Sequence, residues 1–543
     1  MVLTAYAVDP LLAQLYAEQR AAAVLPDGPA QIIAPAGSGK TTTLIARLGV
    51  LLGRGVDPAR ILVVTFNRDA AVELTTRIAA KLAPLAPSAT EIEVRTLHAL
   101  ARRVLLDAGF GVRPLADRLP LLRAARRRCA VGRADEARPL PEAAELDAML
   151  AAWKIEGTLP PREAQAVLAE YAALLAARGL IDFDDLLVRA RNLLETDPEV
   201  GARWQARFGY VLVDEFQDVD AVQLGLVRLL AEPERNLFVV GDDDQTIYAW
   251  RLADVRRILD FTVDYPDAER VMLATNYRCP ADVVAASRRL VSVNNERFVK
   301  RIETSALRGT APSLLAIGTA APDWPDQLVA LAADETNGGG RICFLARTRT
   351  ELEPIVLSLI RAGLPHTTSL PAALDAEPVS TLVDALRELP GQEPPFDALL
   401  RLRAARSWRR IEDDALSDED HAALDAAIGW AAGFRNAGAF VAGYDAARKR
   451  LTALRSPDAA IELVTVHRAK GREWETVVIV GFEDERFPNR RALVGAVDPI
   501  RALEEERRLA YVALTRATRR LILAFDPAHP SRFLAEMGAT AAD

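Results

Sequence analysis

The sequence predicts an α/β protein of two parallel-sheet lobes, each interrupted by a mainly helical insertion. Short apolar runs alternate with helical patterns in two parts of the chain, residues 1–98 with 182–275 and residues 276–370 with 457–543. Alanine- and arginine-rich segments without strand signals, residues 99–181 and 371–456, divide these parts. At 543 residues, the chain is also long for a single hydrophobic core.

The strands of the predicted sheets are short apolar runs with the length of buried strands. They cover residues 31–34, 60–66, 91–95, 210–213, 236–240 and 271–274 in the first lobe, and 341–346, 462–466, 476–480 and 520–524 in the second. Several of them run directly into polar side chains. Because ligands bind at the carboxyl ends of strands in open parallel sheets, we expect the functional residues there.

A phosphate-binding loop is predicted at residues 31–43, which read Q-I-I-A-P-A-G-S-G-K-T-T-T between a strand and a helix. Glycines without a Cβ atom let the backbone N–H groups and the helix N-terminus wrap an anion closely. Lys40 is expected to reach the β- and γ-phosphates, and the Thr41 hydroxyl to bind Mg²⁺. Ala34 stands where the general pattern has glycine. The predicted nucleotide contacts are Gly37, Ser38, Gly39, Lys40, Thr41 and Thr42.

Two acidic residues follow the strand at residues 210–213. Beside a phosphate-binding loop, one such carboxylate holds Mg²⁺ and the next polarises the attacking water, so we assign Asp214 to the metal and Glu215 to the water. The alternative interpretation is a helix N-cap followed by a solvated acidic turn.

Composition excludes several classes of protein. No apolar run approaches the roughly 20 residues of a membrane span, and the first residues lack the pattern of a secretory signal. The three cysteines, Cys129, Cys279 and Cys343, are too far apart for a C-x-x-C pair, which favours a reducing cytoplasm. The formal net charge of −8 argues against indiscriminate polyanion binding, although a local groove can still be basic.

Eight segments in order resemble the motifs of the superfamily 1 helicases of the UvrD/Rep/PcrA type. They read A-P-A-G-S-G-K-T, T-F-N-R-D-A-A, T-L-H, V-D-E-F-Q-D, G-D-D-D-Q-T-I-Y-A-W-R, N-Y-R, V-T-V-H-R-A-K-G-R-E-W and E-E-E-R-R-L-A-Y-V-A-L-T-R-A. The resemblance covers nearly the whole chain. It implies two RecA-like P-loop NTPase lobes that use ATP and Mg²⁺ to move 3′ to 5′ along single-stranded DNA and to unwind 3′-tailed duplex. Repair or replication proteins and a nucleoid-associated location in the cytoplasm are further expectations, with no membrane partner.

The resemblance also implies roles for residues outside the phosphate-binding loop. It assigns adenine to Gln19 and Tyr277, the ribose to Glu473, γ-phosphate sensing to Gln245, and the charge of phosphoryl transfer to the arginine fingers Arg278 and Arg516. Aromatic side chains on which bases stack, with polar neighbours that contact the strand, form a DNA-binding set: Phe66, His98, Tyr248, Trp250, Arg251 and His467.

The chain departs from the family pattern in a few places. G-R-E-W replaces G-L-E-F, W-R-L-A replaces W-R-G-A, and Arg68 stands where asparagine is common. The insertion at residues 371–456 is short and lacks the Gly-Ile-Gly-type loop that grips duplex DNA, with residues 405–416 near its expected place. The chain also ends soon after residue 524, so neither a nuclease domain nor an interaction tail is expected.

Three alternatives to the helicase remain open. The short second insertion favours a translocase that strips proteins from DNA without separating its strands. A small-molecule P-loop kinase would lack DNA-stimulated turnover, and the segments Y-A-W-R and V-T-V-H argue against it. An inactive scaffold is disfavoured because Lys40, Glu215 and Arg516 are all present.

Overall fold

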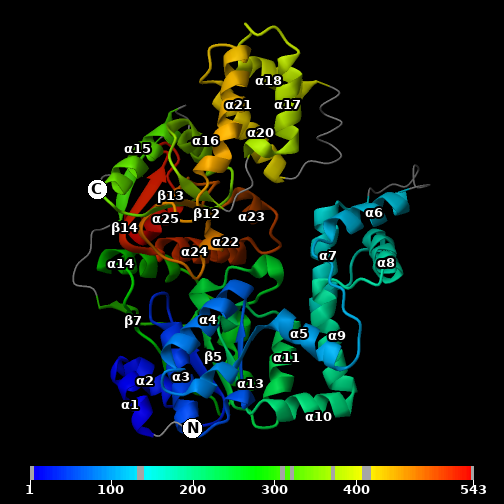
Figure 1. Ribbon diagram of the computed structural model, residues 1–543, viewed down its shortest axis with the longest axis vertical. Coiled ribbons are helices and arrows are strands. Elements are labelled where there is room, and N and C mark those ends of the chain that lie inside the picture. The colour runs from blue at the N-terminus through cyan, green and yellow to red at the C-terminus, as the bar shows by residue number, and fades with distance from the viewer. Residues whose placement is uncertain are drawn as a thin grey trace. The chain divides into compact units, whose positions relative to one another are not determined.

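The structure is a computed structural model that describes residues 5–130, 140–305, 312–317, 323–368, 373–405 and 418–539. The chain divides into two compact units (Figure 1). Unit 1 comprises Met1–Thr275 and Glu296–Arg301, and unit 2 comprises Asn276–Asn295 and Ile302–Asp543. The chain therefore leaves unit 1 after Thr275, returns for a few residues, and leaves again.

Unit 1 is built on a six-stranded parallel sheet in the order β3-β2-β4-β5-β1-β6. Its strands are β1 (Ala30–Ile33), β2 (Ile61–Thr65), β3 (Glu93–Thr96), β4 (Tyr210–Val213), β5 (Leu237–Gly241) and β6 (Glu269–Met272). Because all six run the same way, the loops after β1, β2, β3, β4 and β5 leave from one edge of the sheet.

Helices cover both faces of this sheet. The helices of unit 1, including those of the first insertion, are α1 (Ala5–Ala13), α2 (Ala17–Ala23), α3 (Lys40–Gly53), α4 (Arg68–Lys81), α5 (Leu97–Asp107), α6 (Leu119–Ala130), α7 (Ala143–Glu156), α8 (Arg162–Ala177), α9 (Phe183–Thr196), α10 (Pro198–Arg207), α11 (Ala221–Ala231), α12 (Arg256–Leu259) and α13 (Phe261–Asp264). Alternate residues of each strand enter different cores, as the period of a β-strand requires. Ile32 and Phe238 pack with α3 and α4, whereas Ile33 and Val239 pack with α9 and α11.

The first helical insertion has a core of its own. Helices α6, α7 and α8 bury Leu122, Leu146, Leu168 and Tyr171 among themselves. Since this cluster is separate from those on the sheet, the three helices pack as a subdomain of unit 1. Helix α9 follows them and packs on the sheet.

Unit 2 contains a second six-stranded parallel sheet in the order β11-β12-β10-β13-β14-β9. Its strands are β9 (Ser313–Ala316), β10 (Ile342–Ala346), β11 (His366–Thr368), β12 (Ile461–Thr465), β13 (Trp474–Val480) and β14 (Ala517–Phe525). A separate pair, β7 (Thr275–Asn276) and β8 (Glu303–Thr304), lies where the chain passes between the units.

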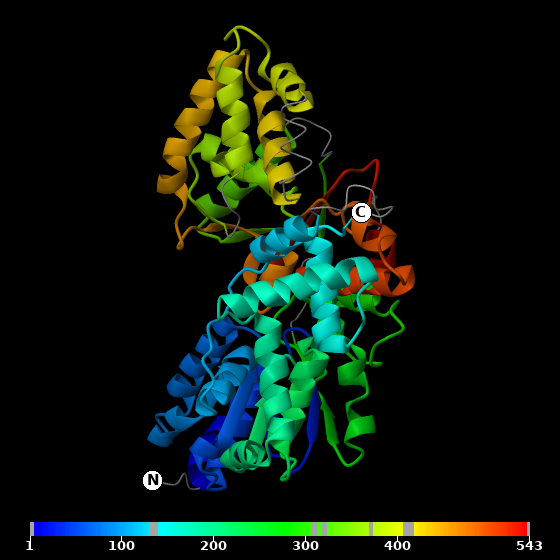
Figure 2. The ribbon, with the colours of Figure 1, turned by 90° about the vertical axis from the view of Figure 1, so that its right-hand side faces the viewer.

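The helices of unit 2 include a bundle formed by the second insertion. They are α14 (Ala281–Val291), α15 (Trp324–Asn337), α16 (Glu353–Ala362), α17 (Glu377–Arg387), α18 (Pro395–Ala404), α20 (Asp418–Ala431), α21 (Ala437–Leu454), α22 (Val466–Ala469), α23 (Arg490–Val494), α24 (Pro499–Leu514) and α25 (Arg532–Met537). Figure 2 shows α17, α18, α20 and α21 side by side, in yellow to orange. They share one continuous core with β10 and α16, so this insertion is an extension of the unit 2 core.

The α/β class with two parallel sheets is confirmed. The strands β7, β8, β9 and β11 were not predicted; β7, β8 and β11 have only two or three residues, too few to show a period. The predicted lobe boundaries remain a prediction, with one difference: Glu296–Arg301 was placed in the second lobe and belongs to unit 1. Of residues 405–416, only Ala405 is described. Among the described residues, no helix has the length and apolar character needed to cross a membrane.

Candidate nucleotide and nucleic-acid sites

The predicted phosphate-binding loop joins β1 to α3 in unit 1. Gly39 caps the helix at φ +85°, and Gly37 has φ +71°, both in the left-handed region that favours glycine. The Ser38 hydroxyl donates to the carbonyl of Pro35 (2.7 Å), which closes the loop on itself. Lys40 begins the helix, and its first-turn neighbours Thr41, half-buried, and Thr42, exposed, follow it. The loop therefore presents backbone N–H groups at a helix N-terminus, as an anion site requires.

Gln19 packs against this loop from α2. Its Nε2 donates to the Ser38 carbonyl (2.9 Å), and its Oε1 accepts from the backbone N–H of Tyr16 (3.2 Å). The contact with Gly39 is so close that a Cβ atom there would lie 2.4 Å from Gln19 Nε2. The structure thus makes Gln19 a support of the loop, and its predicted contact with adenine stays a prediction.

Glu215 faces the loop from the end of β4. Its carboxylate lies 3.4 Å from the Lys40 ammonium, and its backbone N–H donates to Asp214 Oδ1 (3.0 Å). The backbone of Glu215 is left-handed (φ +53°, ψ +44°), which costs energy for a residue with a side chain. The strain directs Glu215 toward Lys40 and argues against the alternative of a solvated acidic turn.

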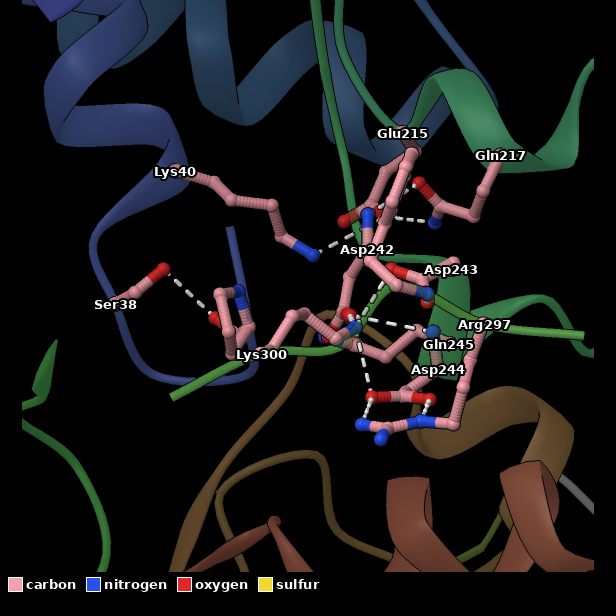
Figure 3. Close-up of polar contacts among 12 residues, drawn as sticks. Ser38, Lys40, Glu215, Gln217, Asp242, Asp243, Asp244, Gln245, Arg297 and Lys300 are labelled. Carbon is pink, nitrogen blue, oxygen red and sulfur yellow. Dashed lines mark hydrogen bonds and ion pairs between the residues drawn. The ribbon is translucent and has the colours of Figure 1, made fainter. Parts of the chain in front are cut away.

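A buried hydrogen-bond chain connects Glu215 to the next strand (Figure 3). Gln217 donates from Nε2 to Glu215 Oε2 (2.5 Å) and accepts at Oε1 from the backbone N–H of Asp242 (3.0 Å). Asp242, which follows β5, accepts in turn from Gln245 Nε2 (2.7 Å). The side chains assigned to the water and to the γ-phosphate are therefore held in one network within unit 1. Sequence reasoning missed Gln217, although it lies inside V-D-E-F-Q-D.

Aromatic side chains lie on the loops after β2 and β5. The rings of Phe66 and Tyr248 are stacked, with centroids 4.6 Å apart and an interplanar angle of 23°. Trp250 lies 6.4 Å from Tyr248, is 65% exposed, and carries the Arg251 guanidinium over its ring at 4.9 Å. The structure brings these four predicted DNA contacts together as an accessible aromatic face.

His98 lies at the start of α5, after β3, and its ring packs edge-on against Phe183 (5.7 Å). Burial lowers the pKa of His98, Asp184 opposes that shift, and Arg251 adds to it. Phe183 is 44% exposed and was missed by sequence reasoning.

Unit 2 gathers three of the predicted nucleotide residues. Arg278 Nε donates to Glu473 Oε2 (2.6 Å), and Arg278 NH1 contacts the Thr515 carbonyl (3.5 Å). The next residue, Arg516, is 1% exposed and donates to the carbonyls of Val512 (2.9 Å) and Arg472 (3.2 Å). These bonds fix both guanidinium groups. Tyr277 is half-buried beside Arg278.

His467 lines a cleft of about 1320 Å³ that lies wholly within unit 2. Burial, assisted by Arg347 and Lys470, lowers the pKa of His467 to about 4, so its ring is neutral near pH 7. Six carboxylates line the cleft, from Glu351, Asp425, Glu483, Asp484, Glu485 and Asp526, together with six arginines: Arg347, Arg349, Arg486, Arg490, Arg491 and Arg532. Sequence reasoning missed all six arginines, although R-T-R-T directly follows a predicted strand.

Comparison with known protein families gives two matches. Residues 15–266 match the UvrD/REP helicase N-terminal domain, and residues 447–526 match the UvrD-like helicase C-terminal domain. The first match contains the phosphate-binding loop, Glu215 and the aromatic face. The second contains His467, Glu473 and Arg516.

Curated relatives align along nearly the whole chain. An ATP-dependent DNA helicase PcrA of Leuconostoc citreum is 27% identical over 98% of this chain and 85% of its own length. DNA helicase II of Escherichia coli is 28% identical over 98% of this chain and 88% of its own length. An ATP-dependent DNA helicase UvrD2 of Mycobacterium tuberculosis is 29% identical, over 97% and 82%.

Proposed function

We propose that this chain moves 3′ to 5′ along single-stranded DNA. The premise is that the chain belongs to the UvrD/Rep/PcrA-type superfamily 1 helicases and is an ATP-dependent DNA helicase. One observation carries the proposal. The side chains suited to ATP hydrolysis and those suited to base stacking follow neighbouring strands of one sheet: Glu215 follows β4, Phe66 follows β2, and Gln245 and Tyr248 follow β5. Binding or loss of the γ-phosphate can therefore shift the side chains of the aromatic face through the short loops that follow β4 and β5.

Hydrolysis is the first step of the proposal. The phosphates lie on the N–H groups at the start of α3, with Lys40 on the β- and γ-phosphates. Glu215 takes a proton from the water that attacks the γ-phosphorus, and ADP leaves as the bond to the γ-phosphate breaks. Gln217 holds the Glu215 carboxylate, while Gln245 senses whether the γ-phosphate is present.

Mg²⁺ fits the donor atoms that unit 1 offers beside the phosphates. The Thr41 hydroxyl and the Asp214 carboxylate are hard oxygen donors, and Mg²⁺ in phosphoryl-transfer enzymes takes one or two carboxylates together with phosphate oxygens. The Lys40–Glu215 contact shows that the loop and the acidic pair face each other. The ion, when bound, neutralises phosphate charge.

Unit 2 supplies the remaining nucleotide contacts in this proposal. Arg278 and Arg516 spread the charge that develops on the transferred phosphoryl group. Tyr277 stacks on the adenine, with Gln19 on its edge, and Glu473 binds the ribose. Because these side chains belong to a different unit from Lys40, ATP binding and hydrolysis change how the units engage, which drives the movement.

Single-stranded DNA is the proposed track. Stacking on Phe66, Tyr248 and Trp250 accepts any base, since every base has a π-face. In unit 2, His467 contacts the backbone or a base of the strand. Unwinding of a 3′-tailed duplex follows from movement along one strand. The proposed partners are repair or replication proteins, and the proposed location is the nucleoid in the cytoplasm.

A second candidate function is a translocase that removes proteins from DNA without separating strands. The observation in its favour is the short second insertion, whose described helices α17, α18, α20 and α21 merge with the core of unit 2. A duplex-gripping subdomain is expected to be an independent body.

The test measures ATP hydrolysis with and without single-stranded DNA, and strand separation on 3′-tailed and 5′-tailed duplexes, for the wild type and Glu215→Gln. We expect DNA to stimulate hydrolysis strongly, Glu215→Gln to abolish it while ATP still binds, and only the 3′-tailed duplex to open. Stimulation with protein displacement but no unwinding supports the second candidate. A rate that DNA leaves unchanged refutes both.

A further inference from the structure

The segment Glu296–Arg301 returns from unit 2 to unit 1 between two stretches of unit 2 chain. It follows α14 and precedes β8, and we call it the strap. The ring of Phe298 in the strap lies under the Arg270 guanidinium (4.8 Å). Two of its three cations, Arg297 and Lys300, have no role in the proposed reaction so far, yet both form ion pairs with the loop after β5.

Lys300 is enclosed by three consecutive carboxylates that follow β5. Its Nζ atom lies 2.7 Å from Asp242 Oδ1, 2.6 Å from Asp243 Oδ1 and 2.7 Å from Asp244 Oδ2 (Figure 3). All four side chains are completely buried. A buried lysine is costly unless charges compensate it, so this cluster is an anchor and not an incidental surface pair.

Arg297 strengthens the same anchor. It donates from Nε to Asp244 Oδ1 (2.9 Å) and from NH2 to Asp244 Oδ2 (2.8 Å), a bidentate pair. The backbone N–H of Phe298 donates to Asp243 Oδ2 (2.8 Å). Each of the three aspartates is therefore held by the strap.

Charge in the cluster is nearly balanced, with three carboxylates against two cations. Burial raises the pKa of Asp243 to about 6, although Lys300 opposes that rise. Burial also acts to raise the pKa of Asp244, but Lys300 and Arg297 hold it below its usual value. Of these two carboxyls, Asp243 therefore takes up a proton more readily.

Asp242 joins the anchor to the catalytic network. The carboxylate that receives Lys300 on Oδ1 receives Gln245 Nε2 on Oδ2, at 2.7 Å. The backbone N–H of Asp242 donates to Gln217, which donates to Glu215. A continuous line of contacts therefore runs from Lys300 to Gln245 and to Glu215.

We infer that Lys300, with Arg297, is a positioning residue for ATP hydrolysis: it fixes the loop after β5 so that Gln245 and Glu215 are aligned on the γ-phosphate and the attacking water. Both ends of the strap continue directly into unit 2, so the same contacts couple that unit to the alignment of the loop. The inference rests on the proposed roles of Glu215 and Gln245.

The test needs a variant that removes Lys300 without leaving an unbalanced buried charge. Lys300→Met combined with Asp243→Asn removes one positive and one negative charge. We expect kcat for ATP to fall about 10- to 100-fold, as a displacement of roughly 1 Å in an active site produces, with KM for ATP nearly unchanged. We also expect the stimulation by single-stranded DNA to be reduced.

A matched control exists in the first insertion. Lys154 lies between Asp182 (2.6 Å) and Asp185 (2.7 Å), so Lys154→Met with Asp185→Asn makes the same kind of change. This control is expected to lower the melting temperature and to leave kcat at the wild-type value. A purely structural role for Lys300 predicts the same result for both double variants, which would overturn the inference.

A second variant covers the case in which the Lys300 double variant does not fold. Arg297→Lys keeps the charge but cannot make both bonds to Asp244, and we expect a smaller fall in kcat at constant KM. A wild-type kcat in this variant also overturns the inference. If the wild type hydrolyses no ATP, or Glu215→Gln hydrolyses it normally, the proposed function fails instead.

Discussion

Truncating the exposed tryptophan of the aromatic face tests the DNA-binding proposal most directly. Trp250 is 65% exposed, so Trp250→Ala removes little buried area and the fold should persist. Tyr248 is less suitable, because it is half-buried and stacked on Phe66 at 4.6 Å. Base–aromatic stacking contributes about 1–3 kcal/mol per base, and about 1.4 kcal/mol corresponds to tenfold in affinity. We therefore expect Trp250→Ala to raise the Kd for oligo-dT about 5- to 150-fold.

The measurement is fluorescence anisotropy of labelled oligo-dT at several salt concentrations. The slope of log affinity against log salt should stay at its wild-type value, because stacking releases no counterions. Trp153→Ala is the matched control: this tryptophan lies on α7 of the same unit, is 42% exposed, and has no proposed contact with DNA. If both variants bind oligo-dT equally well, the aromatic face is not the DNA-stacking surface.

Two further predictions follow from the geometry. Gly39→Ala would combine a left-handed backbone with a Cβ atom 2.4 Å from Gln19 Nε2, and should weaken ATP binding at least about tenfold. Gly157→Ala is the control, because Gly157 is also left-handed (φ +74°) but has no atom within 4 Å of an added Cβ. It should add only backbone strain of about 1–2 kcal/mol and retain wild-type affinity for a fluorescent ATP analogue. If both variants lost the same affinity for the analogue, the contact between Gln19 and Gly39 would not be the cause. His467, with its pKa lowered to about 4, binds protons less readily than in the unfolded chain, where the pKa is about 6.5. The neutral ring's contribution to stability is thus complete above about pH 6.5 and is lost toward pH 4. His467→Gln should therefore flatten the dependence of melting temperature on pH in that window. An unchanged profile would refute the burial of His467 as a neutral ring.

Local patterns in the sequence were sufficient to predict a phosphate-binding loop. A strand, a glycine-containing turn and a helix within residues 31–43 predict an anion site, because glycine freedom and helix N–H groups act over a few residues. The rule that ligands bind at the carboxyl ends of parallel strands located Glu215, and the resemblance to the helicase family supplied Gln245 and the residues of the aromatic face. The structure places all of these at one edge of the unit 1 sheet.

Other features were decided by tertiary structure alone. In the sequence, Lys300 is one lysine in a charged stretch that is far from residues 242–244. Only folding brings its ammonium next to the carboxylates of Asp242, Asp243 and Asp244. The arginines of the unit 2 cleft come from loops after different strands, so no window of sequence contains them together. Gln19 was predicted from resemblance to contact adenine, and the structure shows both of its polar atoms bonded to the chain.

The physical reason for this division is the range of the forces involved. Turn geometry, strand periodicity and helix capping depend on neighbouring residues, so the sequence determines them directly. Burial and charge compensation depend on which distant segments pack together, and the energy of an ion such as the Lys300 ammonium depends on that packing. The sequence by itself determined two α/β lobes and predicted a phosphate-binding loop; the tertiary structure decided which charges hold the loop after β5 in place.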